Sequence, residues 1–381
     1  MPEIWLRYGS TDVVLDIRFE NLANQISATF PVMPDDQVAA ALGAVPLTDD
    51  NILMVALSGS KATAKVVTML AEQARAKGFS FTVDVPQRFA GALRANLAGN
   101  ETVSINRIDY RQSLGDRMSK FQRTIMISSV SYDPLFGFAG APTILLRNLL
   151  DENKMAEAFA ARKDNKPAPG VQGEPLKVAK SAVEGIAATT TTTTTSVELV
   201  AGSGGIAGVH VGSISEAFDK AISQLRSISV VETDPVKCAI VSASSEAGTH
   251  LTLANSLNSL WNTIHMVKEG GAAILVAENR EGVGGGALQM FIEGRLKPDQ
   301  LHLSPYIDGL EHLLFMEEMK RQEIELGLVS TLPHYYAGTK LGFSTYASMK
   351  DILDKLSEKQ GKNFRALVMS DADIVLLNPR A

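Results

Sequence analysis

The segment that most constrains the fold is an apolar run of strand length that ends in a glycine-rich turn. The run covers residues 272–277. It follows a Lys-Glu-Gly-Gly sequence at 268–271 and leads into the turn Glu-Gly-Val-Gly-Gly-Gly at 281–286. Buried parallel strands read as near-continuous apolar runs, and ligands of open α/β sheets bind at the carboxyl ends of the strands. Glycine lets the backbone approach a ligand closely. The segment therefore predicts an α/β fold and marks Gly284 and Gly285 as candidate ligand-binding residues.

The first half of the chain carries a βαβ pattern. Apolar strands at 52–57 and 79–85 flank a helix at 62–76, and right-handed crossover makes the two strands parallel neighbours. The threonine-rich run at 189–195 is interpreted as part of one long strand, 188–201, because β-branched side chains favour strands.

The strand pattern restarts after Pro235, with a strand, a helix of apolar i, i+3, i+4, i+7 periodicity and a second strand over 236–277. We place a domain boundary before it. The predicted N-terminal α/β domain covers 1–231 and the C-terminal α/β domain covers 235–360. Because termini often return to the first domain, we expect residues 363–381 to join the N-terminal domain.

Charge, apolar run length and cysteine count exclude several classes of protein. The net charge of −6 and the scattered basic residues exclude a broad field for nucleic acid or an anionic membrane. No apolar run approaches the roughly 18 residues that span a bilayer. The single cysteine, Cys238, excludes an intrachain disulfide and a thiolate metal site within one chain. The opening residues lack a secretory signal, so we expect a cytoplasmic protein, and a homo-oligomer stays open.

Two strand-to-helix turns are candidate anion sites, because helix N-termini offer unsatisfied N–H groups and a positive dipole end. The first turn, at residues 58–61, combines hydroxyls, a flexible backbone and an ammonium group. The second turn, at residues 242–249, is rich in hydroxyls. Plain N-capping by serine is the competing interpretation. The candidate residues of the two turns are Ser58, Gly59, Ser60, Lys61, Ser244 and Ser245.

Histidines are few and give no metal site. All six lie at or after residue 210, and no two have metal-ligand spacing. His334, which two tyrosines follow, is the most site-like of them. A serine-hydrolase nucleophile elbow is absent from the sequence.

Taken together, these pieces resemble the nickel-dependent lactate racemase family. Leu-Arg-Tyr-Gly at 6–9 is similar to the family's Leu-Pro-Tyr-Gly, and Gly-Phe-Ala-Gly at 137–140 to the start of its Gly-Phe-Ser-Gly-Gly-Arg-Lys. The sequences at 268–271 and 281–285 resemble its Lys-Glu-Gly-Gly strand and Asp-Gly-x-Gly-Gly turn. The resemblance covers nearly the whole chain. It implies two α/β domains with largely parallel sheets, an active site in the interdomain cleft, and isomerase ancestry.

The family's nickel chemistry does not carry over. Its members hold a nickel pincer nucleotide on a lysine and use two histidines as an acid/base pair. The pincer lysine aligns to Thr143, one histidine to Asp133, the nickel-ligating histidine to Lys177, and a substrate-site lysine to Asn258. Neither Asp nor Lys reproduces an imidazole's metal ligation and near-neutral pKa. We therefore predict no nickel pincer, no other cofactor and no metal.

These observations favour a nickel-free, lactate racemase-like protein that binds a small anionic ligand, a hydroxy acid or a nucleotide, in the cleft. Whether it is an enzyme stays open. If it is catalytic, Lys61, Asp133 and Lys177 are the charged groups expected to reach the ligand, against the alternative of exposed charges without a role. Two other functions remain: a non-catalytic pseudoenzyme with a structural or interaction role, and a 2-hydroxy-acid racemase or epimerase with altered ligands.

Overall fold

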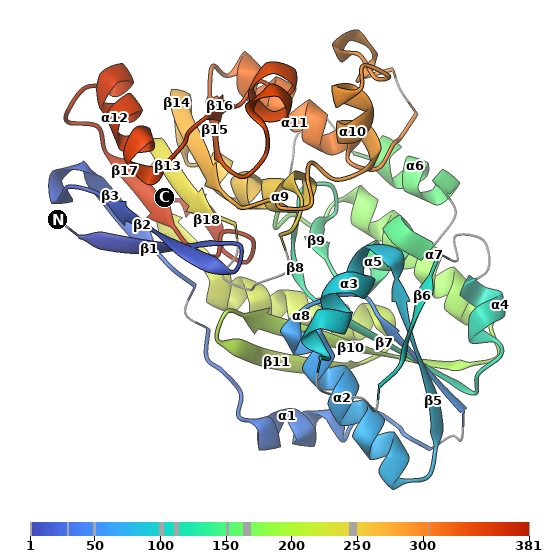
Figure 1. Cartoon of the computed structure of the whole chain (residues 1–381). Coiled ribbons are helices and arrows are strands. Elements are labelled where there is room, and N and C mark those ends of the chain that lie inside the picture. The colour runs from blue at the N-terminus through green and yellow to red at the C-terminus, as the bar shows by residue number, and fades with distance from the viewer. Residues whose placement is uncertain are drawn as a thin grey trace. The chain divides into compact units, whose positions relative to one another are not determined.

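The computed structural model describes the whole chain except residues 1, 29, 49–50, 99–102, 110–113, 150–151, 163–168, 244–249, 304 and 381. The chain forms two compact units (Figure 1). The inserted unit is built mainly from residues 30–228, and the terminal unit mainly from the two ends of the chain, residues 2–28 and 229–380. Within the described ranges, none of the helices is long and apolar enough to cross a membrane.

The inserted unit contains a six-stranded sheet in which every neighbouring pair is parallel except the pair of β10 and β11. In spatial order its strands are β11 (Gly205–Gly212), β10 (Thr193–Gly202), β7 (Arg123–Ser129), β4 (Asn51–Ala56), β5 (Ser80–Pro86) and β6 (Ile105–Ile108). A small hairpin is formed by β8 (Ser131–Asp133) and β9 (Gly137–Ala139). The helices are α1 (Asp35–Leu42), α2 (Lys61–Ala76), α3 (Gln87–Asn96), α4 (Leu114–Met118), α5 (Ala141–Leu149), α6 (Glu152–Ala160), α7 (Glu174–Thr189) and α8 (Ile214–Ser229).

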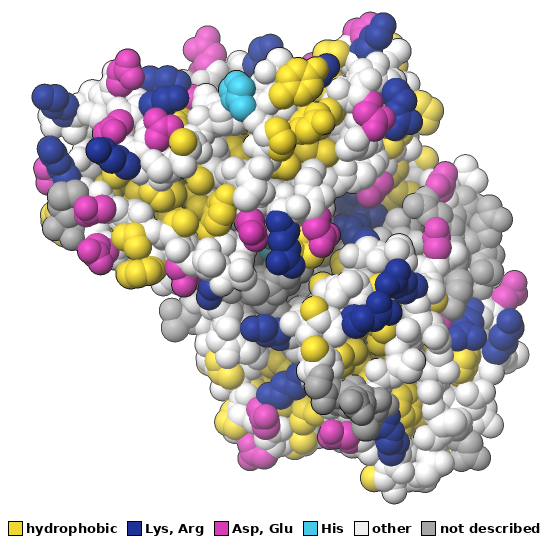
Figure 2. All heavy atoms as spheres, in the orientation of Figure 1, with side chains coloured by type: hydrophobic (Ala, Val, Ile, Leu, Met, Phe, Trp, Pro, Cys, Tyr) yellow, Lys and Arg dark blue, Asp and Glu magenta, His cyan; other side chains and the backbone are white. Residues whose placement is uncertain are grey.

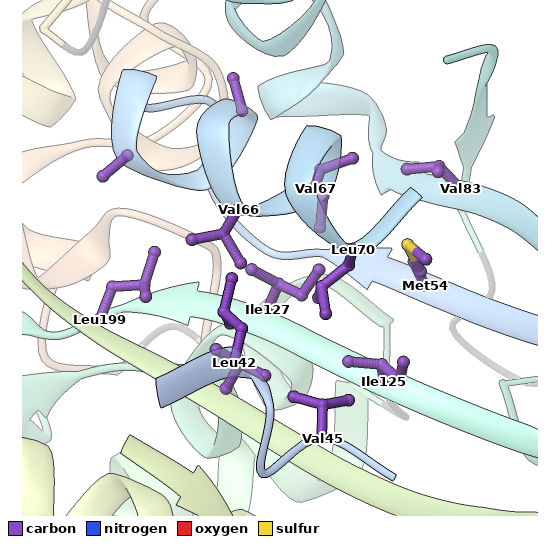
Figure 3. Close-up of a cluster of buried hydrophobic side chains, with 14 of the residues drawn as sticks. Leu42, Val45, Met54, Val66, Val67, Leu70, Val83, Ile125, Ile127 and Leu199 are labelled. Atoms are coloured by element: carbon purple, nitrogen blue, oxygen red, sulfur yellow. The ribbon is translucent and has the colours of Figure 1, made fainter. Parts of the chain in front are cut away.

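The βαβ pattern of the first half is confirmed: β4 and β5 are parallel neighbours and α2 connects them. Figure 3 shows how the apolar face of α2, with Val66, Val67 and Leu70, packs over Ile125 and Ile127 of β7. Fully burying one such aliphatic side chain contributes about 1.5–3 kcal/mol.

The threonine-rich segment begins as helix rather than strand, which corrects the prediction of one strand over 188–201. Helix α7 continues to Thr189 and β10 starts only at Thr193. The hydroxyls of Thr189 and Thr190 donate to the carbonyls of Ile186 and Ala187, 2.9 and 3.1 Å away. Threonine side chains can thus satisfy backbone carbonyls at the end of a helix, and this local bonding overrides their strand preference here.

The terminal unit contains a second six-stranded sheet, which is entirely parallel. In spatial order its strands are β16 (Ser344–Thr345), β15 (Glu325–Val329), β14 (Val267–Val276), β13 (Val236–Ser242), β17 (Ala366–Met369) and β3 (Leu22–Ile26). Two further strand pairs are the hairpin of β1 (Glu3–Tyr8) and β2 (Thr11–Asp16), and β12 (Val230–Thr233) with β18 (Leu376–Pro379). Helices of the unit are α9 (Leu253–Ile264), α10 (Gly286–Ile292), α11 (Leu310–Arg321) and α12 (Met349–Gln360), with short 3-10 turns at Phe19–Asn21 and Pro298–Gln300 and a π-helix at Tyr335–Lys340.

The division of the chain differs from the sequence-based one. Residues 1–28 and the final segment 363–381 were expected in the N-terminal domain, but their described strands β3 and β17 extend the sheet of the terminal unit. The cause is pairing between distant segments, since β17 lies between β13 and β3. Asn21 reinforces this pairing by donating to the carbonyls of Lys362 and Phe364 at 2.8 and 2.7 Å. The cleft expected between the domains stays a prediction.

The N-terminal hairpin packs on this second sheet. Ile4, Leu6, Leu15 and Ile17 are buried in one apolar cluster with side chains of β13 and β14. The hairpin therefore turns an apolar face toward the sheet. Its partner is the core of the terminal unit, which begins more than 200 residues later.

Candidate functional site at the carboxyl edge of the terminal sheet

The carboxyl ends of β14, β13 and β17 meet at one edge of the terminal sheet. Backbone hydrogen bonds join the segments that follow them: Ala243 N–H donates to Val276 at 3.3 Å, and Ala372 N–H donates to Ser242 at 3.1 Å. Ligands bind at this edge in open α/β sheets. The polar residues that follow these three strands are therefore candidates for a ligand-binding site.

His250 and Asp373 form a partly buried pair at this edge. The His250 Nε2 lies 3.7 Å from Asp373 Oδ2, and the two side chains are 15% and 19% exposed. Burial lowers the pKa of His250 to about 4, so its imidazole is neutral at pH 7. Asn262 of α9 holds the adjoining loop, because its amide donates to the carbonyls of Ala372 and Asp373 at 2.8 and 3.0 Å. Sequence reasoning singled out neither His250 nor Asp373.

Two buried polar residues at the same edge have left-handed backbone conformations. Asn279 follows β14 with φ 51°, and Asp371 follows β17 with φ 53°. Asn279 accepts from the Ser256 hydroxyl at 2.6 Å and donates to the Ser330 hydroxyl at 3.2 Å. Asn and Asp visit this region more readily than other residues with a side chain, and such conformations concentrate at ligand sites. A third residue with a side chain and positive φ, Glu323, lies before β15 and is exposed, so the two buried ones are both at the carboxyl edge.

The glycine-rich turn covers the N-terminus of α9. Leu253 and Ala254 donate their N–H groups to the carbonyls of Gly282 and Val283 at 3.0 and 3.1 Å. Thr252 caps the helix by accepting from the N–H of Asn255. The helix donors that sequence reasoning offered to an anion are therefore used by the chain's own carbonyls.

This packing also explains why residue 284 is a glycine. Its φ is +92°, and a Cβ at this position would lie 3.0 Å from the Cβ of Ala254. Gly285 is the N-cap of the short helix α10, and space for a Cβ is open there. Asn258 is partly exposed on α9, whereas the candidates Ser244 and Ser245 lie outside the described residues.

The Leu-Arg-Tyr-Gly sequence of the hairpin reaches the same edge. Ser242 at the end of β13 donates its hydroxyl to the Arg7 carbonyl at 2.7 Å. A Cβ at Gly9, where φ is +62°, would collide with the Glu278 carboxylate. Burial and the charge of Glu278 raise the pKa of Tyr8. The start of the chain thus contacts the segments that end β13 and follow β14.

A π-helix follows β15 at this side of the sheet. His334, which sequence reasoning singled out, lies just before it, and its Nδ1 is 2.7 Å from the Thr345 hydroxyl. Tyr335 and Tyr336 are exposed and in edge contact, with ring centroids 5.6 Å apart. π-helical turns are rare and recur at functional sites.

In the inserted unit, the predicted turn at Ser58–Lys61 is closed by internal contacts. Ser60 caps α2 by accepting from the N–H of Thr63 at 3.1 Å, and its own N–H donates to the Ser58 hydroxyl at 3.1 Å. Gly59 packs closely against α3, where a Cβ would lie 2.6 Å from that of Ala92. The capping interpretation accounts for these hydroxyls. Lys61 is exposed at the first position of α2.

Asp133 and Lys177 have local partners. Asp133 is buried and accepts from the N–H groups of Leu135 and Phe136, both at 2.8 Å, and from Arg147 Nη2 at 3.3 Å. Lys177 is 71% exposed and pairs with Glu174 one helical turn away, at 2.7 Å. Asp133 thus fixes the turn after β8, and Lys177 lies on a solvated face of α7. Their catalytic roles stay predictions.

Glu198 is a fully buried acid that sequence reasoning missed. It accepts from the Ser128 hydroxyl at 2.5 Å and from the N–H of Ala141, the first residue of α5, at 2.9 Å. Burial raises its pKa to about 7, against the lowering effect of the hydrogen bonds from Ser128, Ala141 and Ser196. The signal in the sequence is a single acid inside the apolar strand residues 197–200.

No side-chain cluster in the described part of the chain offers three or more His, Cys, Asp or Glu groups to one metal ion. On the face drawn in Figure 2, Lys and Arg side chains are scattered, with Asp and Glu side chains among them, and do not gather in one broad patch.

Comparison with solved structures places the fold. The chain is similar to the lactate racemase apoprotein of Thermoanaerobacterium thermosaccharolyticum, with a TM-score of 0.77 and 14% identity over 99% of this chain and 100% of that one. It is also similar to a structural genomics target from Thermotoga maritima, with a TM-score of 0.70 and 11% identity over 93% and 100% of the two chains. No family model and no curated protein sequence matches. The chain therefore has a lactate racemase-like α/β fold with largely parallel sheets, as the sequence predicts.

Proposed function

We propose that this protein is a divergent relative of lactate racemase that binds a small anionic ligand, a hydroxy acid or a nucleotide, without a nickel pincer. The observation that carries the proposal is the likeness to the lactate racemase apoprotein over 99% of the chain. Any reaction catalysed here then differs from nickel-dependent racemisation, because the residues of that chemistry are replaced.

The side chains at the replaced positions do not fit the pincer group. Thr143, at the position of the attachment lysine, is buried and its hydroxyl contacts the backbone of Gly140 at 3.1 Å. Asp133 and Lys177, at the histidine positions, are engaged by backbone N–H groups and by Glu174. The group requires an amine at the attachment position and imidazoles at the ligand positions, and neither Thr143 nor the pair Asp133 and Lys177 supplies them there.

The carboxyl edge of the terminal sheet is the proposed binding site. Arg280 is exposed directly after Asn279, and a guanidinium there suits a carboxylate or phosphate. The neutral imidazole of His250 lies at the same edge with Asp373 beside it. A bound anion near this pair would raise the pKa of His250, so the proposal requires tighter binding as the pH falls below 7.

Calorimetric titration of the purified chain with D- and L-lactate, larger 2-hydroxy acids and adenine nucleotides tests the proposal. We expect one of these classes to bind with 1:1 stoichiometry. Removing a charged hydrogen bond costs about 1.5–3 kcal/mol, so Arg280→Gln should weaken binding roughly tenfold or more. Arg321→Gln, an exposed arginine on α11, is the matched control and should leave binding unchanged. A flat response across the whole panel would contradict the proposal.

A second function, a non-catalytic interaction protein, is favoured by one observation. Trp5 and Phe19, near the N-terminal hairpin, are 63% and 80% exposed. Exposed aromatic side chains are typical of protein interfaces. A flat ligand titration together with a self-association that Trp5→Ser and Phe19→Ser abolish would support this function instead.

The third function, racemisation or epimerisation of a 2-hydroxy acid with altered ligands, has a separate signature. It requires exchange between the D and L forms of one hydroxy acid, which chiral chromatography measures. Exchange that depends on added nickel would overturn the nickel-free proposal, whereas metal-independent exchange would add an activity to it.

A further inference from the structure

The amino edge of the terminal sheet carries a basic pocket that the proposed function does not use. The pocket has a volume of about 650 Å³ and lies where β13, β14 and β17 begin and β12 and β18 end. It is therefore at the opposite ends of the strands from His250 and Arg280.

Four cationic side chains from four segments line this pocket. They are Lys237 of β13, Lys268 of β14, Arg365 just before β17, and Arg380 just after β18. Among the lining residues that the structure describes, Asp234 is the acidic one, and it is 77% exposed and 3.6 Å from Arg380. The lining thus carries an excess of three positive charges in a protein whose net charge is −6.

Parallel pairing produces this grouping. Cys238 is opposite Ala366, so Lys237 and Arg365 directly precede paired positions on two neighbouring strands. The pairing of β13 with β14 is interrupted between Val236 and Cys238, and Lys268 begins the segment of β14 that is left unpaired there. Like charges at such positions repel one another, which a bound anion would relieve. The amides of Asn24 and Asn363 also line the pocket and supply further hydrogen-bond donors.

We propose that this pocket binds a small molecule carrying two or more negative charges of the phosphate class. Lysine and arginine are the side chains that bind phosphate oxygens, and one phosphate group alone would leave part of the positive charge unpaired. A volume of about 650 Å³ is within the range of small-molecule sites. Because the pocket and the carboxyl edge are at opposite ends of the strands, the two sites bind independently in this proposal.

Titration of the full chain with inorganic pyrophosphate at low salt, followed by calorimetry and ³¹P NMR, tests the proposal. We expect saturable 1:1 binding that weakens as salt rises, because these charges are partly exposed. The double variant Lys237→Gln, Arg365→Gln should weaken binding at least tenfold. Inorganic phosphate should bind more weakly than pyrophosphate.

The matched control removes the same charge elsewhere. Lys154→Gln with Lys220→Gln eliminates two exposed lysines of the inserted unit and should leave pyrophosphate affinity within twofold. Equal weakening of pyrophosphate binding in both double variants would mean that the anion is attracted by the overall charge and not by this pocket, which would overturn the proposal. Absence of binding at about 1 mM pyrophosphate would also overturn it. Hydroxy-acid affinity should be unchanged in the pocket variant, so failure here is distinguishable from failure of the proposed function.

Discussion

The two units bury ionisable side chains in opposite ways. In the inserted unit, the carboxylate of Glu198 is enclosed and receives hydrogen bonds from Ser128 and from the start of α5. In the terminal unit, His250 is buried as a neutral imidazole but stays 15% exposed beside Asp373. Both units have a largely parallel sheet with polar groups near the carboxyl ends of their strands. In the inserted unit they hold the unit's own loops, whereas in the terminal unit His250 and Asp373 stay partly exposed.

The largest expected effect is the loss of the Glu198 carboxylate. Glu198→Ala removes the acceptor for three buried donors and leaves a cavity, so we expect the free energy of unfolding to fall by roughly 3–5 kcal/mol. Urea unfolding measures this. Glu232→Ala, an exposed glutamate on β12, is the control and should change it by less than about 0.5 kcal/mol. A loss below about 1 kcal/mol for Glu198→Ala would contradict the internal role of the carboxylate.

The next largest effect is the pH dependence of stability, which should have opposite slopes for the buried groups of the two units. The pKa of Glu198 is raised from 4.5 to about 7, so the folded state binds more protons than the unfolded state between these pH values. Stability from this group is full below pH 4.5 and falls by about 3 kcal/mol as the pH rises to 7. Glu198→Gln should remove this slope. An unchanged slope in the variant would show that another group titrates.

His250 should give the reverse slope. Its pKa is lowered from 6.5 to about 4, so the unfolded state binds more protons between these values. Stability from His250 is full above pH 6.5 and falls by about 3 kcal/mol as the pH drops to 4. Titration of the His250 ring by NMR measures the pKa directly, and His250→Gln should flatten the acid limb of the stability profile. A ring that titrates near pH 6.5 would contradict the burial on which this contrast depends.

A smaller loss of stability is expected from alanine substitutions in the glycine-rich turn. Gly282 and Gly284 have similar φ values of +91° and +92°, but a Cβ meets the Cβ of Ala254 only at Gly284. Both alanine substitutions should cost about 1–2 kcal/mol from the backbone alone. Gly284→Ala should cost more than Gly282→Ala, because it also separates the turn from the start of α9. If thermal unfolding shows the same loss of stability for both variants, packing of the turn on α9 contributes nothing to stability.

The smallest effect is expected for the exposed lysines of the inserted unit. Lys177 contributes an exposed i, i+3 ion pair, so Lys177→Ala should change stability by less than about 0.5 kcal/mol. If the ligand binds at the terminal sheet, Lys61→Ala and Lys177→Ala should leave its affinity unchanged. A loss of affinity in either variant would move the site to the inserted unit and restore the roles first predicted for these residues.

Local patterns in the sequence predict much of the fold. The strands at 52–57 and 272–277 are recognisable because they are buried on both faces, and the apolar face of α9 is visible as a helical repeat. The placement of β3 and β17 is not predictable in this way, since their pairing joins segments more than 300 residues apart.

The site was harder to predict than the fold. A serine before a helix reads the same whether it binds an anion or caps the helix, and Ser60 caps. His250 and Asp373 are 123 positions apart in the sequence, and only the sheet brings them within 3.7 Å. Glu198 was missed because apolar neighbours predict a strand without revealing that one acid within it has buried donors to satisfy.

Native mass spectrometry of the purified chain with a hydroxy-acid ligand and nickel present tests the central claim most directly. The account predicts an unmodified polypeptide mass and a non-covalent 1:1 complex with the anion that Arg280→Gln removes. A covalent mass increment on a lysine together with bound nickel would contradict it, because the residues of the inserted unit would then support the chemistry that they are proposed to have lost.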